Sequence, residues 1–192
     1  MIGAFSRDGE GFAAPIDPEH NRILQRLVSE ILTLLDEPGD VTSLLQATVG
    51  FETSRPGPAD PTLENLLPPM SDDCCEAARL RALTEDFLRS EKSVRLRMVR
   101  RDLQAAEGPA STAVWVSRTQ AWDWLAALND LRLALAGELG ITSAQAAEEV
   151  WDTARGTAHP GARRTMACVI YVVVTWWQDS LLRAVREDVP SH

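Results

Sequence analysis

The sequence predicts a mainly α-helical protein: a compact bundle of five to seven helices around a buried C-terminal helix, with a small N-terminal β-hairpin. Three observations support this fold class. Apolar residues recur at helical spacing along most of the chain. Pro-Gly and Asp-Pro pairs separate these helical segments. Strand-like patterns are confined to two short stretches. Hydrophobic residues make up 45% of the 192 residues, which is enough for a core without a metal or disulfide staple. We therefore expect one domain over residues 1–192.

Residues 1–16 predict a β-hairpin, because Asp8-Gly9 stands between two apolar stretches and this pair is a strong turn signal. Residues 111–116 include a short β-branched and aromatic run that predicts a strand. An isolated hairpin is only marginally stable. We therefore expect the hairpin to pack against other elements and this strand to pair with it.

Residues 17–106 are predicted to be helical. Asp17-Pro18 opens the first helix, since Asp is a good N-cap and Pro suits the first helical position. Pro38-Gly39 ends it, and residues 40–51 predict a shorter helix. The Pro-rich loop over residues 52–61 follows, and its last two residues, Asp60-Pro61, open the next short helix.

A long helix is predicted from Ser71 to Ala106, where Gly108-Pro109 follows. We expect its apolar stripe to face the core; the stripe consists of Leu80, Leu83, Phe87, Val94 and Met98. Residues 79–101 hold eight basic and three acidic side chains, within a chain whose net charge is −9. Arg89, Lys92 and Arg100 are expected to point away from the stripe.

This basic face has two interpretations. It is either a solvated surface paired with acidic neighbours or a binding surface for an acidic protein or a nucleic-acid backbone. Binding of nucleic acid has no further support, because no aromatic residues interleave the basic ones and no helix-turn-helix is recognisable.

Residues 117–187 are expected to form the helical core. Capping-box patterns at Ser117–Gln120 and Thr142–Gln145 open helices over about 118–139 and 143–154. The last helix, over 162–187, is apolar on nearly every side and is expected to be central. Packing in or near the core is expected for the tryptophans Trp122, Trp124, Trp176 and Trp177, whereas Trp115 or Trp151 could anchor an interface.

Three polar residues, Asn129, Asp130 and Arg132, interrupt the apolar helix 118–139. Buried charges need partners, and the candidates in other helices are Arg81, Thr84, Glu85, Gln178 and Asp179. These side chains are expected to form either a hydrogen-bonded network that fixes helix register or a pocket for a partner or ligand.

The three cysteines are candidates for redox sensing. Cys74 and Cys75 lie in the first turn of the long helix, where backbone N–H groups lower a thiol's pKa. The neighbouring carboxylates of Asp72, Asp73 and Glu76 oppose that effect. Cys168 lies in the most apolar helix, where it is either an inert core thiol or a disulfide partner for this pair.

Enzyme signals are weak: none of the three histidines has metal-ligand spacing, and no phosphate-binding loop or nucleophile elbow occurs. We expect no catalysis, no metal and no cofactor. The N-terminus does not resemble a signal peptide, and the longest apolar stretch is shorter than the roughly 20 residues that span a bilayer. A cytoplasmic protein without membrane contact is expected.

Three stretches carry a resemblance to a known family. They are Asp60-Pro61 to Lys92; Trp122 with Leu128-Asn129-Asp130-Leu131-Arg132-Leu133; and Tyr171 with Thr175-Trp176-Trp177-Gln178-Asp179-Ser180-Leu181. Over roughly residues 17–186 the chain resembles an actinobacterial family catalogued as a domain of unknown function, of which some members are regarded as transcription-associated regulators of oxidative stress. The resemblance implies a helical cytoplasmic protein with no established chemistry.

Three functions follow as alternatives. The resemblance implies a non-enzymatic, redox-responsive regulator that binds a sigma factor or RNA polymerase. Because family members are typically encoded beside the ClpS adaptor, it also implies an accessory protein of Clp-dependent proteolysis. The residues themselves leave open a small-ligand binder or an enzyme with a pocket near Asn129, Asp130 and Glu85. The oligomeric state stays open, and a dimer is one possibility.

Overall fold

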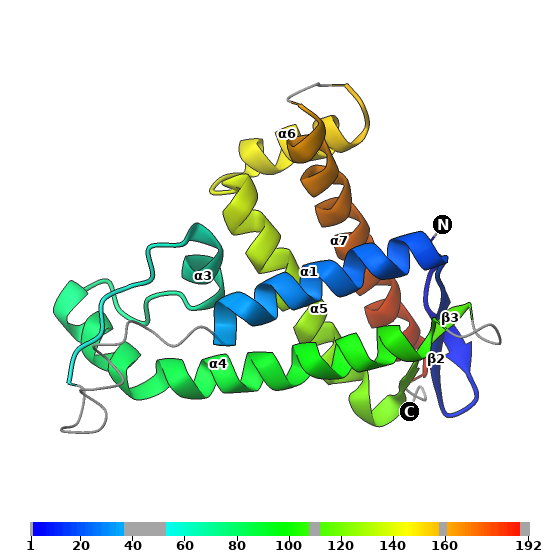
Figure 1. Cartoon of the computed structure of the whole chain (residues 1–192), viewed down its shortest axis with the longest axis horizontal. Coiled ribbons are helices and arrows are strands. Elements are labelled where there is room, and N and C mark those ends of the chain that lie inside the picture. Colours follow the sequence, from blue (N-terminus) through cyan, green and yellow to red (C-terminus); the bar gives the residue numbers. More distant parts are fainter. Residues whose placement is uncertain (1, 37–52, 108–111, 158–160, 189–192) are drawn as a thin grey trace.

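The computed structural model describes residues 2–36, 53–107, 112–157 and 161–188, and it confirms the mainly helical fold class. Figure 1 shows a small sheet at one end of the molecule and a long helix, α4, along its lower edge. The predicted helix at 40–51 lies outside the described residues. The helices are α1 (Pro18–Asp36), α3 (Pro61–Leu66), α4 (Cys74–Ala105), α5 (Ala121–Leu139), α6 (Ala144–Ala154) and α7 (Ala162–Asp188), with a 3-10 turn, η1 (Arg118–Gln120), before α5.

The sheet has three antiparallel strands in the order β1 (Ser6–Asp8), β2 (Gly11–Pro15) and β3 (Ala113–Ser117). The predicted hairpin and its pairing with the later strand are therefore confirmed. Arg7 lies opposite Phe12, and Phe12 lies opposite Val116. The buried side chains of Phe12, Ala14, Val114 and Val116 attach the sheet to the core.

Helix starts follow the cap residues in the sequence. The side chains of Asp60 and Asp73 accept backbone N–H bonds at the starts of α3 and α4. Ser117 Oγ accepts the N–H of Gln120 at 3.3 Å, as the first capping box predicts. The second box is shifted by one residue, because Ser143 rather than Thr142 caps α6 and accepts the N–H of Ala146.

An aromatic cluster joins the N-terminus to α5 and α7. Phe5 stacks on Trp177 with ring centroids 4.9 Å apart, and Trp124 meets both rings edge-on. The indole N–H of Trp177 donates to the Gly3 carbonyl at 3.1 Å. Trp124 and Trp177 are thus core residues, as predicted. The same prediction is wrong for Trp122 and Trp176, whose residue surfaces are 65% and 43% exposed.

The position of α5 refines the predicted arrangement. α5 packs against α7, α3 and α4, and also touches α1 and β3, so it lies at the centre. α7 packs against α5, α6 and β1 and buries one face, which includes Val174, Trp177 and Leu181. Other apolar residues of α7, namely Met166, Val169 and Trp176, are exposed. The apolar composition of α7 therefore exceeds what its packing uses.

Among the described helices, α7 alone has the length and apolar composition that a membrane span needs, and 28% of its most apolar window is buried. A helix in the core of a soluble protein satisfies the same criterion. We interpret α7 as a packed helix, because Trp177, Leu181 and Val185 belong to the main core cluster. The cytoplasmic location stays a prediction.

The long helix α4 is rotated relative to the prediction. Leu83, Phe87 and Val94 of the expected core stripe are 78%, 67% and 59% exposed. The buried face instead carries Leu96, Val99 and Leu103 in the second half and Arg81, Glu85 and Ser93 in the first. The second half packs on α1 and the core. Because α4 is one continuous helix, its first half must follow that rotation, and charged residues turn inward there.

Candidate functional site

Glu85 lies at the centre of a buried ion-pair cluster on α4. It is 5% exposed. Its carboxylate accepts bonds from Arg81 Nη1 at 3.2 Å and Arg89 Nε at 2.8 Å. Arg81 also donates to the carbonyl of Leu67. Both cations belong to the same helix face as Glu85, at i−4 and i+4, and this explains why the triad forms locally.

Arg89 connects this cluster to the end of α1. Its Nη1 donates to the carbonyls of Leu34 and Leu35 at 3.1 and 3.2 Å. Carbonyls in the last turn of a helix have no partner inside the helix and carry partial negative charge. Arg89 therefore caps α1 from outside and is committed to a structural contact.

The segment before α3 is held to α4 by Arg55. Its guanidinium binds both carboxylate oxygens of Asp86, at 2.7 and 3.3 Å, and lies 3.8 Å from Glu85. The Arg55 N–H donates to the Ala78 carbonyl. The hydrogen bond from Arg55 lowers the pKa of Asp86. These contacts place residues 53–60 along the first half of α4.

A second charged cluster crosses from α4 to α5. Lys92 Nζ lies 2.5 Å from Asp130 Oδ1, and Arg95 lies 3.7 Å from the other carboxylate oxygen. The Asp130 side chain is 4% exposed. Within the described part of the chain, Asp130 Oδ2 and Arg95 Nε are buried without a hydrogen bond. The cluster joins two helices through charge, and the attraction between the Asp130 carboxylate and the two cations offsets part of the cost of removing these groups from water.

The predicted polar network therefore exists as separate clusters. Arg132 donates to Gln178 at 2.9 Å, and Gln178 donates to the Leu125 carbonyl, which links α5 to α7. Thr84 donates to the Leu80 carbonyl of its own helix. Asn129 is half-buried and Asp179 is exposed. The expectation that all these stretches face one another is wrong, because α4 and α7 contact different sides of α5.

The cavity beside Arg81, Thr84 and Glu85 has a volume of about 10 Å³. A space of this size holds one water molecule. Beside Glu85, one of the residues near which a small-ligand pocket was expected, this cavity is thus too small for a ligand larger than water. Among the described residues, no three His, Cys, Asp or Glu side chains lie close enough together to hold a metal ion.

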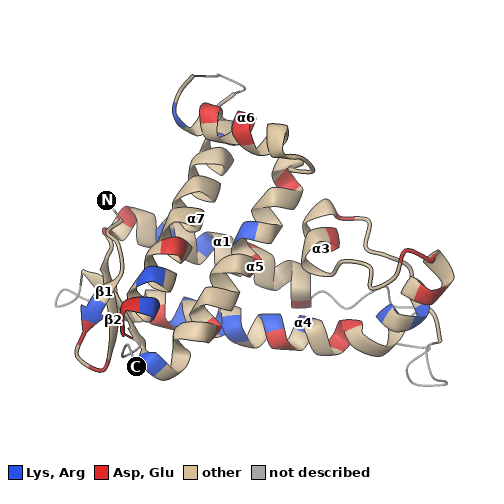
Figure 2. Ribbon diagram, turned by 180° about the vertical axis from the view of Figure 1, so that it is seen from behind, with Lys and Arg blue, Asp and Glu red and all other residues tan. Residues whose placement is uncertain are grey.

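The expected basic binding face is not on the surface. The side chains of Arg89 and Lys92 are 14% and 13% exposed and point into the two ion-pair clusters, while Arg100 is half-buried. Figure 2 shows both basic and acidic residues along α4, and the acidic residues Glu85, Asp86 and Glu91 lie among the basic ones in the sequence. These side chains do point away from the predicted stripe, but the stripe faces solvent, so the expected basic face is turned towards the core.

The structure separates the three cysteines. Cys74 and Cys75 are exposed at the start of α4, with sulfur atoms 4.0 Å apart and no disulfide. Cys168 is fully buried beside Leu139 and Val150, and burial raises the pKa of its thiol. Figure 1 shows the start of α4 and the start of α7 at distant parts of the molecule. A disulfide between Cys168 and the exposed pair requires a large rearrangement.

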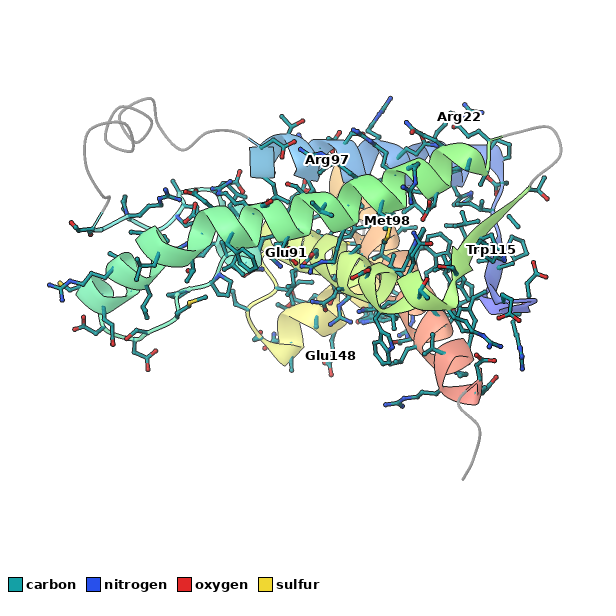
Figure 3. The ribbon with its side chains drawn as sticks, turned by 90° about the horizontal axis from the view of Figure 1, so that it is seen from below. Arg22, Glu91, Arg97, Met98, Trp115 and Glu148 are labelled. Carbon is teal, nitrogen blue, oxygen red and sulfur yellow. The ribbon has the colours of Figure 1, made fainter. Side chains whose placement is uncertain are left out.

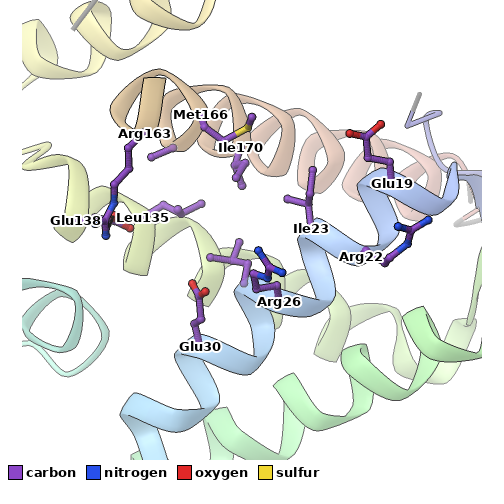
Figure 4. A pocket seen from close by; sticks show the side chains of 12 residues that line it. Glu19, Arg22, Ile23, Arg26, Glu30, Leu135, Glu138, Arg163, Met166 and Ile170 are labelled. Atoms are coloured by element: carbon purple, nitrogen blue, oxygen red, sulfur yellow. Dashed lines mark ion pairs between the residues drawn. The ribbon is translucent and has the colours of Figure 1, made fainter. Parts of the chain in front are cut away.

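A groove with a volume of about 650 Å³ lies where α1, α5 and α7 diverge. Figure 4 shows side chains from all three helices around it. Its floor is apolar and consists of Ile23, Leu27, Leu135, Met166, Ala167 and Ile170. The sequence pattern did not single out this groove, because these residues read as ordinary core positions. One feature of the sequence could have pointed to the groove: α7 carries more apolar residues than a helix that is buried on one side needs.

Charged residues border the groove. On the α1 side, Arg22 and Arg26 are exposed one turn apart, with Glu19 and Glu30 beyond them. On the opposite side, Arg163 lies 3.7 Å from Glu138. Apolar surface with a charged border is typical of a site that receives another protein segment.

Two comparisons with known proteins found similar proteins. A family model described as "Domain of unknown function (DUF2017)" matches residues 2–185. The chain is 30% identical over 155 residues to proteins named "Oxidative stress regulator AosR" from Mycobacterium bovis and from two strains of Mycobacterium tuberculosis. The matched region covers 71% of this chain and 68% of those relatives. No solved structure matches the chain.

Proposed function

This chain belongs to the DUF2017 family, and from that premise we propose that it is a non-enzymatic regulator of the oxidative stress response that acts by contact with the transcription machinery. The proposed partner is a sigma factor or RNA polymerase. The observation that carries the proposal is the similarity to the mycobacterial oxidative stress regulators over most of both chains.

A role without catalysis is supported by the buried carboxylates, because they are held in ion pairs within the protein. Among the residues that the structure describes, Glu85 and Asp130 are the two buried carboxylates, and both are engaged by basic side chains of α4. A general acid or base needs access to a substrate proton. The small cavity beside Glu85 does not offer that access.

We place partner contact at the groove between α1, α5 and α7. An amphipathic helix fits an apolar groove by inserting residues at i, i+3, i+4 and i+7. Arg22 and Arg26 follow one another at helical spacing on the rim. They favour a partner helix with acidic residues one turn apart beside its apolar face.

The redox input is assigned to Cys74 and Cys75. Both thiols are exposed, so peroxide can reach them. A thiolate attacks peroxide, an S–O bond forms as the O–O bond breaks, and water leaves after a proton is taken up. The buried Cys168 serves as an internal reference, since an enclosed thiol with a raised pKa reacts slowly.

The test is capture of partners from the native host with tagged wild-type protein, with and without peroxide, read by mass spectrometry. Recovery of a sigma factor or RNA polymerase subunit in amounts that change with peroxide supports the proposal. A Cys74→Ser/Cys75→Ser variant should lose that change, whereas Cys168→Ser should keep it. Recovery of Clp components in both samples would favour the proteolysis alternative instead.

A further inference from the structure

The exposed face of α4 forms an apolar strip that we call the α4 seam, defined as Leu80, Leu83, Phe87 and Val94. Three of the four are more than half exposed. In Figure 3, which views the molecule from below, α4 lies in front of the other elements and Glu91 and Arg97 flank this side of the helix. The α4 seam is therefore an open surface of the described protein, and exposed apolar strips of this kind mark interaction sites.

Residue spacing along the α4 seam is that of a coiled coil. Leu80, Phe87 and Val94 are seven residues apart, and Leu83 follows Leu80 by three. These intervals correspond to a and d positions of a heptad. The opposite face of α4 is held inward by the ion pairs of Glu85 and Asp130. Rotation of α4 to bury the seam within its own chain would break both clusters.

We propose that a second copy of this chain packs on the α4 seam, so that two α4 helices pair antiparallel around a two-fold axis. Charge along the helix selects this occupant and direction. Among the exposed charged residues at the start of α4, three are acidic (Asp72, Asp73 and Glu76) and one, Arg79, is basic. Near its end, Arg97 and Arg101 are exposed and basic, and Arg97 also pairs with Asp36 of its own chain. A parallel pair brings like charges together, and an antiparallel pair brings the acidic start of each helix to the basic end of the other.

Heptad geometry sets the register. In an antiparallel pair, a positions of one helix lie beside d positions of the other. Val94 of one copy then lies against Leu83 of the other, and the two Phe87 rings meet near the two-fold axis. Glu76 of each copy faces Arg101 of the other. The paired stretch is 26 residues, or roughly 39 Å, long, and the interface is the same patch on both subunits.

Pairing through α4 does not depend on the proposed function. The groove is lined by residues of α1, α5 and α7, and α4 supplies none of its lining. A dimer built on the α4 seam therefore leaves the groove accessible on each copy. One assembly can then offer two partner sites.

The first test is sedimentation equilibrium of the full chain at about 50 µM with a thiol reductant present. We expect twice the mass of one chain. Phe87→Glu places a charge at the axis and should weaken association at least tenfold. Trp122→Glu is the matched control, because Trp122 is an equally exposed aromatic outside the seam; it should remain dimeric. Far-ultraviolet circular dichroism confirms that both variants are folded.

The second test examines direction and register. Glu76→Arg and Arg101→Glu should each weaken association, and the double variant should restore it, since the charge pair is only exchanged. A monomeric wild-type chain would overturn the proposal. So would a Phe87→Glu variant that stays dimeric, or a double variant that associates more weakly than either single variant.

Discussion

At the scale of single residues, Asp130 is a carboxylate on α5 that is 3% exposed and is paired with cations of α4. Its carboxylate lies between Lys92 and Arg95, and one of its oxygens has no hydrogen bond among the described residues. A buried ion pair adds little to stability compared with apolar residues that fill the same space. Removal of one partner is far more costly, because it leaves an uncompensated buried charge.

Asp130→Leu should therefore lower the free energy of unfolding by about 3–5 kcal/mol, measured by urea denaturation. The control is Asp179→Leu, a change of the same kind at an exposed carboxylate, which should shift stability by less than about 0.5 kcal/mol. Equal effects of the two substitutions would mean that Asp130 is not enclosed by the charge cluster.

Cys168 gives stability a dependence on alkaline pH. Burial raises the pKa of its thiol above the ordinary value of 9.0, so the unfolded chain loses this proton before the folded chain does. Stability from this group is complete below about pH 9 and declines as pH rises towards the folded pKa. Cys168→Ala should be less stable than wild type at pH 7, because it removes a buried side chain. The stability difference should narrow as the pH rises above about 9. A gap that stays constant would contradict the assigned burial.

The sequence predicted the burial of some residues correctly but did not predict the burial of others or which charged residues pair. The aromatic pair Trp124 and Trp177 could be assigned to the core from their apolar surroundings. The exposure of Trp122 could not, because it depends on which side of α5 the other helices occupy. Likewise, sequence indicated that Asp130 needs a cation but not that Lys92 supplies it, since the separation along the chain is 38 residues.

At the scale of elements, α4 shows why amphipathic patterns mislead in long helices. It carries apolar residues on two faces: the α4 seam in its first half and Leu96, Val99 and Leu103 in its second. The second set lies against the core and fixes the rotation of the whole helix. A pattern read from the first half alone chooses the wrong face. The cap residues indicated the helix starts to within a few residues. Asp60, Asp73 and Ser117 accept hydrogen bonds from backbone N–H groups only two or three residues further along the chain, so these contacts do not depend on the tertiary packing.

The packing of α3 on α5 depends on the absence of a side chain at Gly137. A Cβ there would lie 2.3 Å from the Pro61 carbonyl oxygen and 2.9 Å from Thr62 Cα. In an open helix, Gly→Ala stabilises by about 1 kcal/mol. Gly137→Ala should instead destabilise by about 1–3 kcal/mol, because the close atoms belong to backbone. Thermal denaturation measures the difference, and a raised melting temperature would show that α3 does not pack here.

At the scale of the whole molecule, the two proposed binding surfaces, the groove and the α4 seam, are apolar surfaces that are not buried in the core. The charges of α4 stabilise the fold from within, and exposed apolar residues of the described chain include Met166 in the groove and Leu83, Phe87 and Val94 along the α4 seam. The sequence indicated that α7 is rich in apolar residues and that α4 is rich in basic ones. Only the packed arrangement shows which of these residues face solvent. The family resemblance indicated a regulatory role. No pattern of residues in the sequence showed which surface would bind the regulated partner.

The most direct test of the proposed function is site-specific photo-crosslinking in the host. A photoreactive phenylalanine analogue replaces Met166, which is 53% exposed in the groove. The same analogue at Arg186, exposed near the other end of α7, is the control. The account predicts that position 166 crosslinks to a sigma factor or RNA polymerase subunit, with a yield that changes on peroxide treatment, and that position 186 does not. Crosslinks from position 166 to no component of the transcription machinery would contradict it.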